Sequence, residues 1–191
     1  MPIEFDLESL RTKYNCKNYF ETGLYDPRKE VSSKTALKCN FGKVFSIEIR
    51  EDRVNLGREV FKEEIESGRY TLYLDDSTNM EQYLSNTNDF DERTIFFLDA
   101  HVDNSSIKNF KRKCPLFEEL SSIKGLNRKD HIILVDDLRI IKNAYPWCET
   151  GFGKIDFLQQ IKELILTINP EYKFDTLDGL VKDDVLVAYV E

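Results

Sequence analysis

Short apolar runs alternate with amphipathic or polar segments along most of the chain. Such runs, only three to six residues long, are typical of strands buried on both faces of a sheet, whereas apolar residues at helical spacing predict crossover helices. The predicted strands are 18–20, 44–47, 70–74, 95–98, 132–135, 172–177 and 185–190. The predicted helices are 34–39, 51–67, 79–84, 115–125 and 155–168, and long loops are predicted at 102–113 and 138–153.

This alternation predicts an α/β fold. Right-handed crossovers between parallel strands place helices on both faces of the sheet. Two helix starts carry a local signal: Ser32 or Ser33 can cap the first predicted helix, and Pro115 suits the first turn of another. The last two strands can pair antiparallel across the turn that contains Asp178 and Gly179. We expect a single domain over residues 1–191, which could also be one domain of a longer protein.

Acidic residues follow the apolar strands with unusual regularity. Because the carboxyl ends of parallel strands meet at one edge of a sheet, the residues after the first five strands should gather there. These residues are Glu21-Thr22-Gly23, Glu48, Asp75-Asp76-Ser77, Asp99 and Asp136-Asp137. Carboxylates that lie this close require a cation, a proton or a cationic partner. The edge is therefore the predicted functional site.

Composition narrows the class of partner. The net charge of −8 argues against nucleic acid, and the basic stretch 108–113 reads more simply as a solvated loop. The four cysteines form no CxxC pair, and no signal peptide or long apolar span is present, so we expect free thiols, a cytoplasmic location and no membrane span. The oligomeric state is left open.

Three of the acidic positions suit a cofactor that contains ribose but no pyrophosphate. Glu48, after the second strand, can accept hydrogen bonds from ribose hydroxyls, although it could also be a plain surface acid. Gly23 permits a tight turn, but no G-x-G-x-x-G pattern follows, which disfavours NAD and FAD. Glu21 could accept hydrogen bonds from an ammonium group. Asp76 and Ser77 could contact adenine, or could cap the helix that follows.

The other acids suit a metal and an acceptor hydroxyl. Asp99, Asp136 and Asp137 form the all-oxygen set that Mg²⁺ prefers, and His101 beside them could act as general base or could simply orient its loop. Arg139 could pair with these acids or hold an anionic substrate.

Some further residues have two open interpretations. The aromatic residues at 145, 147 and 152 could face an acceptor ring or anchor their loop. His131, at the opposite end of its strand, is expected to be structural.

Six motifs in this order resemble class I S-adenosylmethionine-dependent methyltransferases, and within them the macrocin-type sugar and small-molecule O-methyltransferases. They are 19–23 (YFETG), 44–48 (VFSIE), 75–77 (DDS), 97–101 (FLDAH), 114–120 (CPLFEEL) and 135–137 (VDD). The resemblance spans about residues 18–190 and implies a Rossmann-like, mostly parallel sheet of seven strands whose last strand is antiparallel. The first loop lacks the second glycine that is common in this class.

The resemblance also implies roles for single residues. Glu21, Thr22 and Gly23 would lie by the methionine part of S-adenosylmethionine, Glu48 by the ribose, and Asp76 with Ser77 by the adenine. Asp99, Asp136 and Asp137 would bind Mg²⁺ or another divalent cation, with Asp99 also beside the cofactor.

We therefore expect a metal-assisted O-methyltransferase that acts on a hydroxyl of a sugar, glycan or other small molecule, with His101 or Asp99 taking the proton. Two alternatives stay open. One is a metal-independent methyltransferase with His101 as base and the acids paired to Arg139. The other is a catalytically silent cofactor-binding module.

Overall fold

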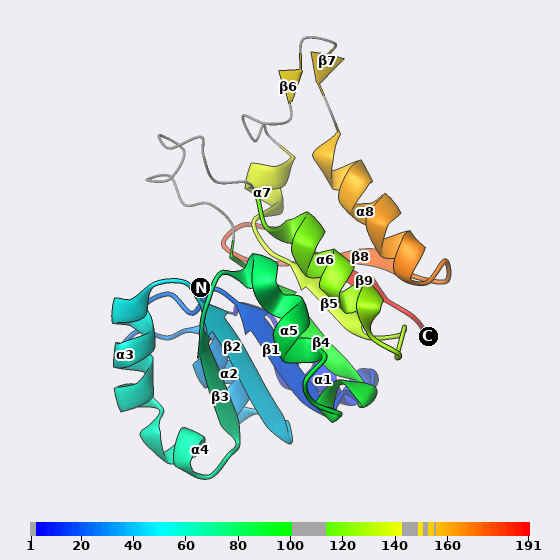
Figure 1. Ribbon diagram of the computed structural model, residues 1–191. Coiled ribbons are helices and arrows are strands. Elements are labelled where there is room, and N and C mark those ends of the chain that lie inside the picture. Colours follow the sequence, from blue (N-terminus) through cyan, green and yellow to red (C-terminus); the bar gives the residue numbers. More distant parts are fainter. Residues whose placement is uncertain (1–2, 101–113, 143–148, 151–152, 155) are drawn as a thin grey trace.

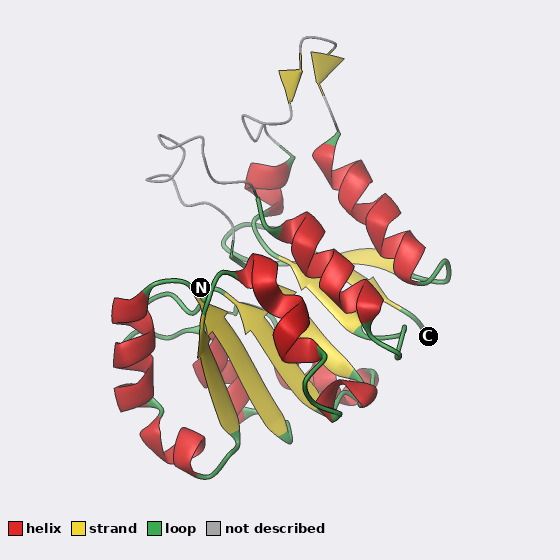
Figure 2. Ribbon diagram, in the orientation of Figure 1, coloured by secondary structure: helices red, strands yellow, loops and turns green. Residues whose placement is uncertain are grey.

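The computed structural model describes residues 3–100, 114–142, 149–150, 153–154 and 156–191. The predicted α/β fold is confirmed. A seven-stranded sheet runs in the order β3-β2-β1-β4-β5-β9-β8, with helices on both of its faces (Figures 1 and 2). Its strands are β1 (Asn18–Thr22), β2 (Lys43–Glu48), β3 (Tyr70–Leu74), β4 (Thr94–Leu98), β5 (Ile132–Val135), β8 (Lys173–Leu177) and β9 (Val185–Tyr189).

Strands β1 to β5 pair in parallel, and β9 runs antiparallel to both of its neighbours, β5 and β8. The strand order reverses between β1 and β4, where the chain crosses from one half of the sheet to the other. In open α/β sheets such a reversal opens a crevice at the carboxyl ends of the strands, which is the usual place for a ligand.

Two helical layers cover the sheet. The front layer in Figure 1 holds α5 (Met80–Leu84), α6 (Leu116–Gly125) and α8 (Phe157–Ile168), and α1 (Leu7–Lys13) and α2 (Ser32–Lys38) lie behind. The helices α3 (Glu51–Val60) and α4 (Lys62–Glu66) lie beside β3. The remaining elements are short: the 3₁₀ turns η1 (Ser77–Asn79) and η2 (Asp89–Asp91), the helix α7 (Leu138–Ile141), and the paired β6 (Glu149–Thr150) and β7 (Gly153–Lys154).

Successive side chains of each central strand enter different cores. Along β4, Phe96 and Leu98 pack into the cluster under α5, α6 and α8, whereas Ile95 and Phe97 pack into the cluster under α1 and α2. All five residues of β4 are buried. This two-sided burial explains why the central strands read as continuous apolar runs in the sequence.

Several predicted elements differ from the structure. Helix α1 was not predicted, and the predicted loop 138–153 contains α7, β6 and β7. The predicted helix 51–67 is interrupted at Phe61, whose buried ring packs edge-on against Tyr70. Ser32 and Ser33 do not cap α2 but lie inside its first turn, because Val31 is the residue before the helix.

No helix among the described residues is both long and apolar enough to cross a membrane. The described cysteines include Cys16 and Cys39, which are free, buried thiols as expected.

Candidate functional site

One row of residues crosses the carboxyl edge of the sheet. The paired positions Thr22–Ile47, Thr22–Leu98 and Leu98–Val135 end the ladders between the central strands. Continuing each register by one residue aligns Glu48, Gly23, Asp99 and Asp136. Backbone hydrogen bonds support this row: Gly23 N donates to Ile47 O at 2.9 Å, and Asp136 N donates to Leu98 O at 3.2 Å. The predicted convergence of the acids is thus a consequence of strand register.

Gly23 makes the turn that follows β1, and the site requires a glycine there. Its φ is +88°, and a Cβ at this position would lie 2.9 Å from Asp99 O. Thr22 fixes the same junction, because its Oγ1 accepts hydrogen bonds from Asp99 N at 3.1 Å and Ala100 N at 3.3 Å. The chain therefore exposes a narrow strip of backbone between the two halves of the sheet.

Glu48 holds the loop after β1. Its Oε2 accepts hydrogen bonds from Leu24 N at 3.0 Å and Tyr25 N at 3.4 Å, and its Oε1 accepts one from Arg50 N at 2.8 Å. A carboxylate offers about four lone-pair sites, so these three bonds leave room for a further donor. Glu48 therefore keeps acceptor capacity at the carboxyl edge of the sheet.

Glu21 points away from the open edge. It is fully buried toward α2, where Ser46 Oγ donates to its Oε1 at 2.7 Å, Ser33 Oγ donates to the same atom, and Tyr19 OH lies 3.2 Å from Oε2. Burial raises the pKa of Glu21, an effect that the hydrogen bonds from neighbouring hydroxyls oppose. Its carboxyl group is thus held by buried hydroxyls of β1, α2 and β2.

Asp76 and Ser77 follow β3. Asp76 Oδ1 accepts from Thr78 N at 3.0 Å and so caps the 3₁₀ turn η1. The sequence interpretation places this cap on the following helix, α5, whose N-cap is instead Asn79, without a side-chain hydrogen bond. Asp75 has a structural role, since its carboxylate accepts from Asn79 Nδ2, Gln82 Nε2 and Tyr83 OH.

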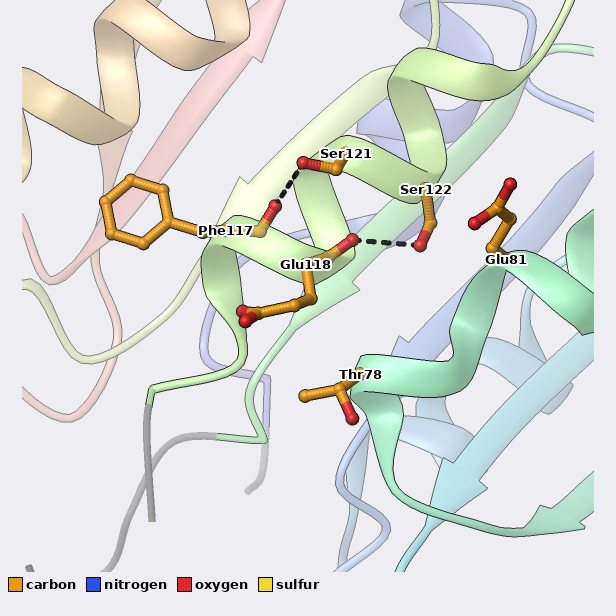
Figure 3. Close-up of a pocket in the computed structure, with 6 residues that line it drawn as sticks. All are labelled: Thr78, Glu81, Phe117, Glu118, Ser121 and Ser122. Atoms are coloured by element: carbon orange, nitrogen blue, oxygen red, sulfur yellow. Dashed lines mark hydrogen bonds between the residues drawn. The ribbon is translucent and has the colours of Figure 1, made fainter. Parts of the chain in front are cut away.

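A groove of about 320 Å³ opens next to this segment, between α5 and α6 (Figure 3). Its lining combines hydroxyls, carboxylates and one aromatic ring: Thr78, Glu81, Phe117, Glu118, Ser121 and Ser122. Ser121 and Ser122 donate to the backbone of their own helix, at Phe117 O and Glu118 O. Their hydroxyl protons are therefore used within α6.

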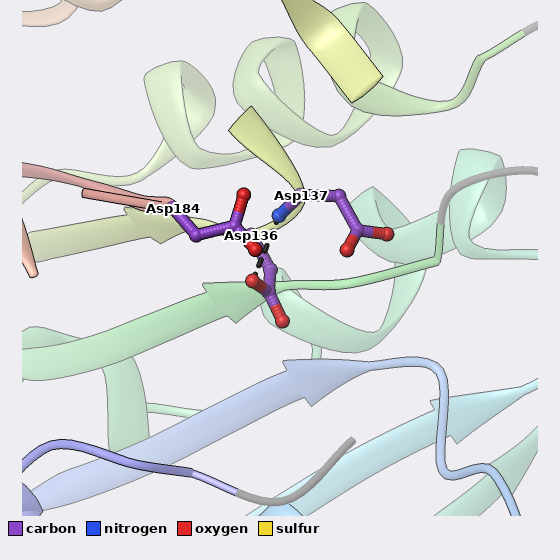
Figure 4. A group of neighbouring side chains, drawn as sticks. All are labelled: Asp136, Asp137 and Asp184. Carbon is purple, nitrogen blue, oxygen red and sulfur yellow. Dashed lines mark hydrogen bonds between the residues drawn. The ribbon is translucent and has the colours of Figure 1, made fainter. Parts of the chain in front are cut away.

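Three buried carboxylates meet beyond β5: Asp136, Asp137 and Asp184, which we call the acid group (Figure 4). One ligand oxygen from each lies within 4.8 Å of the others. Among the described residues Arg139 pairs with two of these acids: its Nη2 lies 2.6 Å from Asp137 Oδ1, and its Nη1 pairs with Asp184 Oδ2.

Asp184 was not predicted, and the antiparallel last strand explains its place. Val135 pairs with Leu186, and continuing that register by two residues sets Asp184 opposite Asp137. Asp184 also caps α7 from outside: its backbone O accepts from Leu138 N and its Oδ1 from Arg139 N, both at 2.8 Å. The register between β5 and β9 cannot be read from the sequence, so the sequence alone could not place Asp184 in the site.

Asp99 is not a member of the acid group, although the row places it next to Asp136. The predicted metal set Asp99, Asp136 and Asp137 therefore lies at one edge, but only two of its members belong to the close cluster. His101 lies outside the described residues, as do the basic stretch 108–113 and the aromatic positions 145, 147 and 152. His131 is buried at the start of β5, where its Nδ1 accepts from Thr94 N at 3.2 Å.

Apolar side chains at the same edge were also missed. Tyr25, Ile49 and Leu74 follow or end β1, β2 and β3, and each is at least 40% exposed. Glu48 pairs with Leu74 in register, precedes Ile49 and accepts from Tyr25 N, so the three residues are neighbours of Glu48 at this edge. Exposed apolar residues at strand ends are a signal that a composition-based reading does not weigh, but they suit the flat face of a base.

Comparisons with known proteins show the fold. Neither a protein-family model nor a curated protein matches the sequence. Among solved structures, an O-methyltransferase from Bacillus cereus in complex with SAH superposes with a TM-score of 0.59 at 15% identity, over 97% of this chain and 79% of that one.

Two further structures agree. SAH-bound methyltransferase PaMTH1 of Podospora anserina gives a TM-score of 0.54 at 16% identity, over 96% of this chain and 75% of that one. The methyltransferase domain of bacterial CtHen1-CN gives 0.54 at 10% identity, over 96% of this chain and 94% of that one. The chain thus has the Rossmann-like fold of these methyltransferases.

Proposed function

We propose that the protein is an S-adenosylmethionine-dependent O-methyltransferase. The observation that carries the proposal is the row Glu48, Gly23, Asp99 and Asp136 at the carboxyl edge, on a fold shared with SAH-bound methyltransferases. The row lies at the strand-order reversal, where α/β sheets bind their ligands. It offers a glycine turn for close backbone approach and acids on both sides of that turn.

The part of this row that follows β2 and β1, together with the segment after β3, suits the cofactor. Thr22 and Gly23 would receive its methionine part, Glu48 would accept from the ribose hydroxyls, and Asp76 with Ser77 would face the adenine. Ile49 and Leu74 would cover the faces of the ring, which removes apolar surface from water. Glu21 would have an indirect role: its hydrogen bonds with Ser33 and Ser46 link β1 to α2 and β2 and so support the turn at Gly23.

The part of the row that follows β4 and β5 suits the acceptor. The sulfonium carbon–sulfur bond breaks as the bond between that carbon and the acceptor oxygen forms, and the hydroxyl proton must leave. The backbone of Asp99 lies beside Gly23, and its carboxylate would accept this proton, with His101 two residues further on as the other candidate base. Because the methyl group is already activated, alignment of the two reactants supplies most of the acceleration.

A divalent ion fits the described arrangement less well than Arg139 does. Carboxylate oxygens are the ligands that Mg²⁺ prefers, but two acids of the cluster already pair with the Arg139 guanidinium. No step of the proposed reaction therefore uses a metal. Metal assistance by Asp99, Asp136 and Asp137 is the second candidate, which the spacing of Asp136, Asp137 and Asp184 favours.

We propose a sugar or glycan hydroxyl as the acceptor, on the sequence resemblance to macrocin-type enzymes. The test is transfer of a labelled methyl group from S-adenosylmethionine to a panel of glycosides, phenols and other small alcohols, with and without a chelator. Transfer to a glycoside supports the proposal. Cofactor binding without transfer to any acceptor would favour the silent module instead, and absence of cofactor binding would contradict both.

A further inference from the structure

Arg139 occupies a position at the acid group where a metal ion would otherwise be expected. We propose that Arg139, held by Asp184, is the resident cation of this group and closes it to divalent ions. The inference concerns the acids on the acceptor side of the proposed site, but it depends on their contacts and not on the methyl-transfer reaction.

The acid group requires positive charge nearby. Asp136, Asp137 and Asp184 are buried, and their oxygens lie within 4.8 Å of one another. Three carboxylates in such a place repel one another and lose hydration, so they require positive charge nearby. Arg139 supplies it through two separate ion pairs, one to Asp137 and one to Asp184.

Asp184 and Asp137 hold Arg139 in position. Asp184 receives both the backbone N–H of Arg139, at 2.8 Å, and its guanidinium. The side chain of Asp184 has no exposed surface and that of Arg139 is 26% exposed, so salt screens this pair less than it screens a surface pair. Asp137 reaches the same guanidinium from a left-handed backbone conformation, φ 61°, which is costly for a residue other than glycine. The Arg139–Asp184 pair holds this turn in place.

Arg139 and a divalent ion would compete for the acid group. A planar guanidinium and a divalent ion would use the same carboxylate oxygens, and the two cations would repel each other at this distance. A divalent ion can therefore enter only if Arg139 leaves. Asp184 and Arg139 are, in this account, positioning residues for Asp137 and for the loop that follows β5.

The test is titration of the whole chain with Mn²⁺, read by its paramagnetic effect on water relaxation, together with thermal unfolding in Mg²⁺. Wild type should show neither binding nor a shift at millimolar ion. Arg139→Gln should gain Mn²⁺ binding, and Mg²⁺ should raise its Tm by about 3 °C or more. Arg128→Gln, which removes another arginine paired with an aspartate, is the matched control and should gain nothing.

Tight Mn²⁺ binding to wild type would overturn the inference, and so would a folded Arg139→Gln that gains none. If Arg139→Gln does not fold, the double variant Arg139→Gln/Asp184→Asn decides. It removes one charge of each sign and should be more stable than the single variant, whereas equal or lower stability would contradict the pairing. Failure of S-adenosylmethionine to bind the same samples would count against the proposed function alone.

Discussion

Gly23 and Asp99 approach each other so closely that a single added carbon on Gly23 would lie 2.9 Å from the carbonyl oxygen of Asp99. This contact joins β1 to β4 at the reversal of strand order, where the proposed cofactor and acceptor would meet. This junction fixes the position of the site more than any one acid does.

The first prediction concerns that junction. Gly23→Ala should lower the free energy of unfolding by about 2–4 kcal/mol, because it adds a steric clash to an unfavourable φ. Gly68→Ala is the control, since Gly68 also has a positive φ, +75°, but has open space around it. It should cost only about 1 kcal/mol. Urea unfolding measures both, and equal losses would show that the approach to Asp99 is unimportant.

Glu48→Gln should weaken S-adenosylhomocysteine binding by about 10-fold or more, because a neutral amide is a poorer acceptor for ribose hydroxyls. Glu51→Gln, at the exposed start of α3, removes the same charge nearby and should leave binding unchanged. Isothermal titration calorimetry compares them. A Glu48→Gln protein that binds as tightly as Glu51→Gln would remove Glu48 from the cofactor site.

His131 should make stability fall in acid. Burial lowers the pKa of His131 to about 3, so the folded protein keeps it neutral while the unfolded chain takes up a proton below about 6.5. Its contribution is therefore lost as pH falls from about 6.5 toward 3, at up to about 1.4 kcal/mol per pH unit. His131→Asn should flatten the pH dependence of the free energy of unfolding, measured with urea between about pH 4 and about pH 7. A constant difference from wild type across that range would contradict it.

Glu21 should show the opposite sign. Its folded pKa is raised by burial, so its ionisation opposes folding, and stability is lost as pH rises from about 4.5 through the folded pKa. Glu21→Gln cannot ionise, so its stability relative to wild type should improve over the same rise in pH. The measurement is the same unfolding series, and a relative stability that does not change with pH would show that Glu21 titrates normally.

Much of the fold could be predicted from the sequence because the central strands are buried on both faces. Strands such as Ile132–Val135 therefore appear as uninterrupted apolar runs, and their order along the chain puts the following acids at one edge. Helix α7 could not be predicted, because its first N–H groups are capped by Asp184, which comes just before the distant strand β9. Local sequence contains no record of that partner.

The candidate site was predictable in part for the same reason. Glu48 and Asp99 follow strands, and parallel register alone brings them beside Gly23. The direction in which a side chain leaves the edge is decided by tertiary packing: Glu21, one residue before Thr22, turns into the core among hydroxyls. Asp184 depends on an antiparallel register that the sequence does not specify.

Removal of metal tests the second candidate function. With Arg139 as the resident cation, methyl transfer should be unchanged after exhaustive chelation and should not rise when Mg²⁺ is restored. Rates with labelled S-adenosylmethionine, measured before chelation, after it and after readdition, give the comparison. Loss of activity with chelator and recovery with Mg²⁺ would favour metal assistance by Asp99, Asp136 and Asp137.

The central claim is that this edge of the sheet transfers a methyl group from S-adenosylmethionine to a hydroxyl. Its most direct test is incubation of the purified chain with methyl-labelled S-adenosylmethionine and a panel of glycosides, with product identified by mass spectrometry. We predict a product heavier by one methylene unit on oxygen, formed by wild type and by Glu51→Gln but strongly reduced in Glu48→Gln and Asp99→Asn. Equal product from Asp99→Asn would assign the proton to His101 instead. A wild-type chain that binds no S-adenosylmethionine, or that binds it and methylates no hydroxyl of the panel, would contradict the central claim.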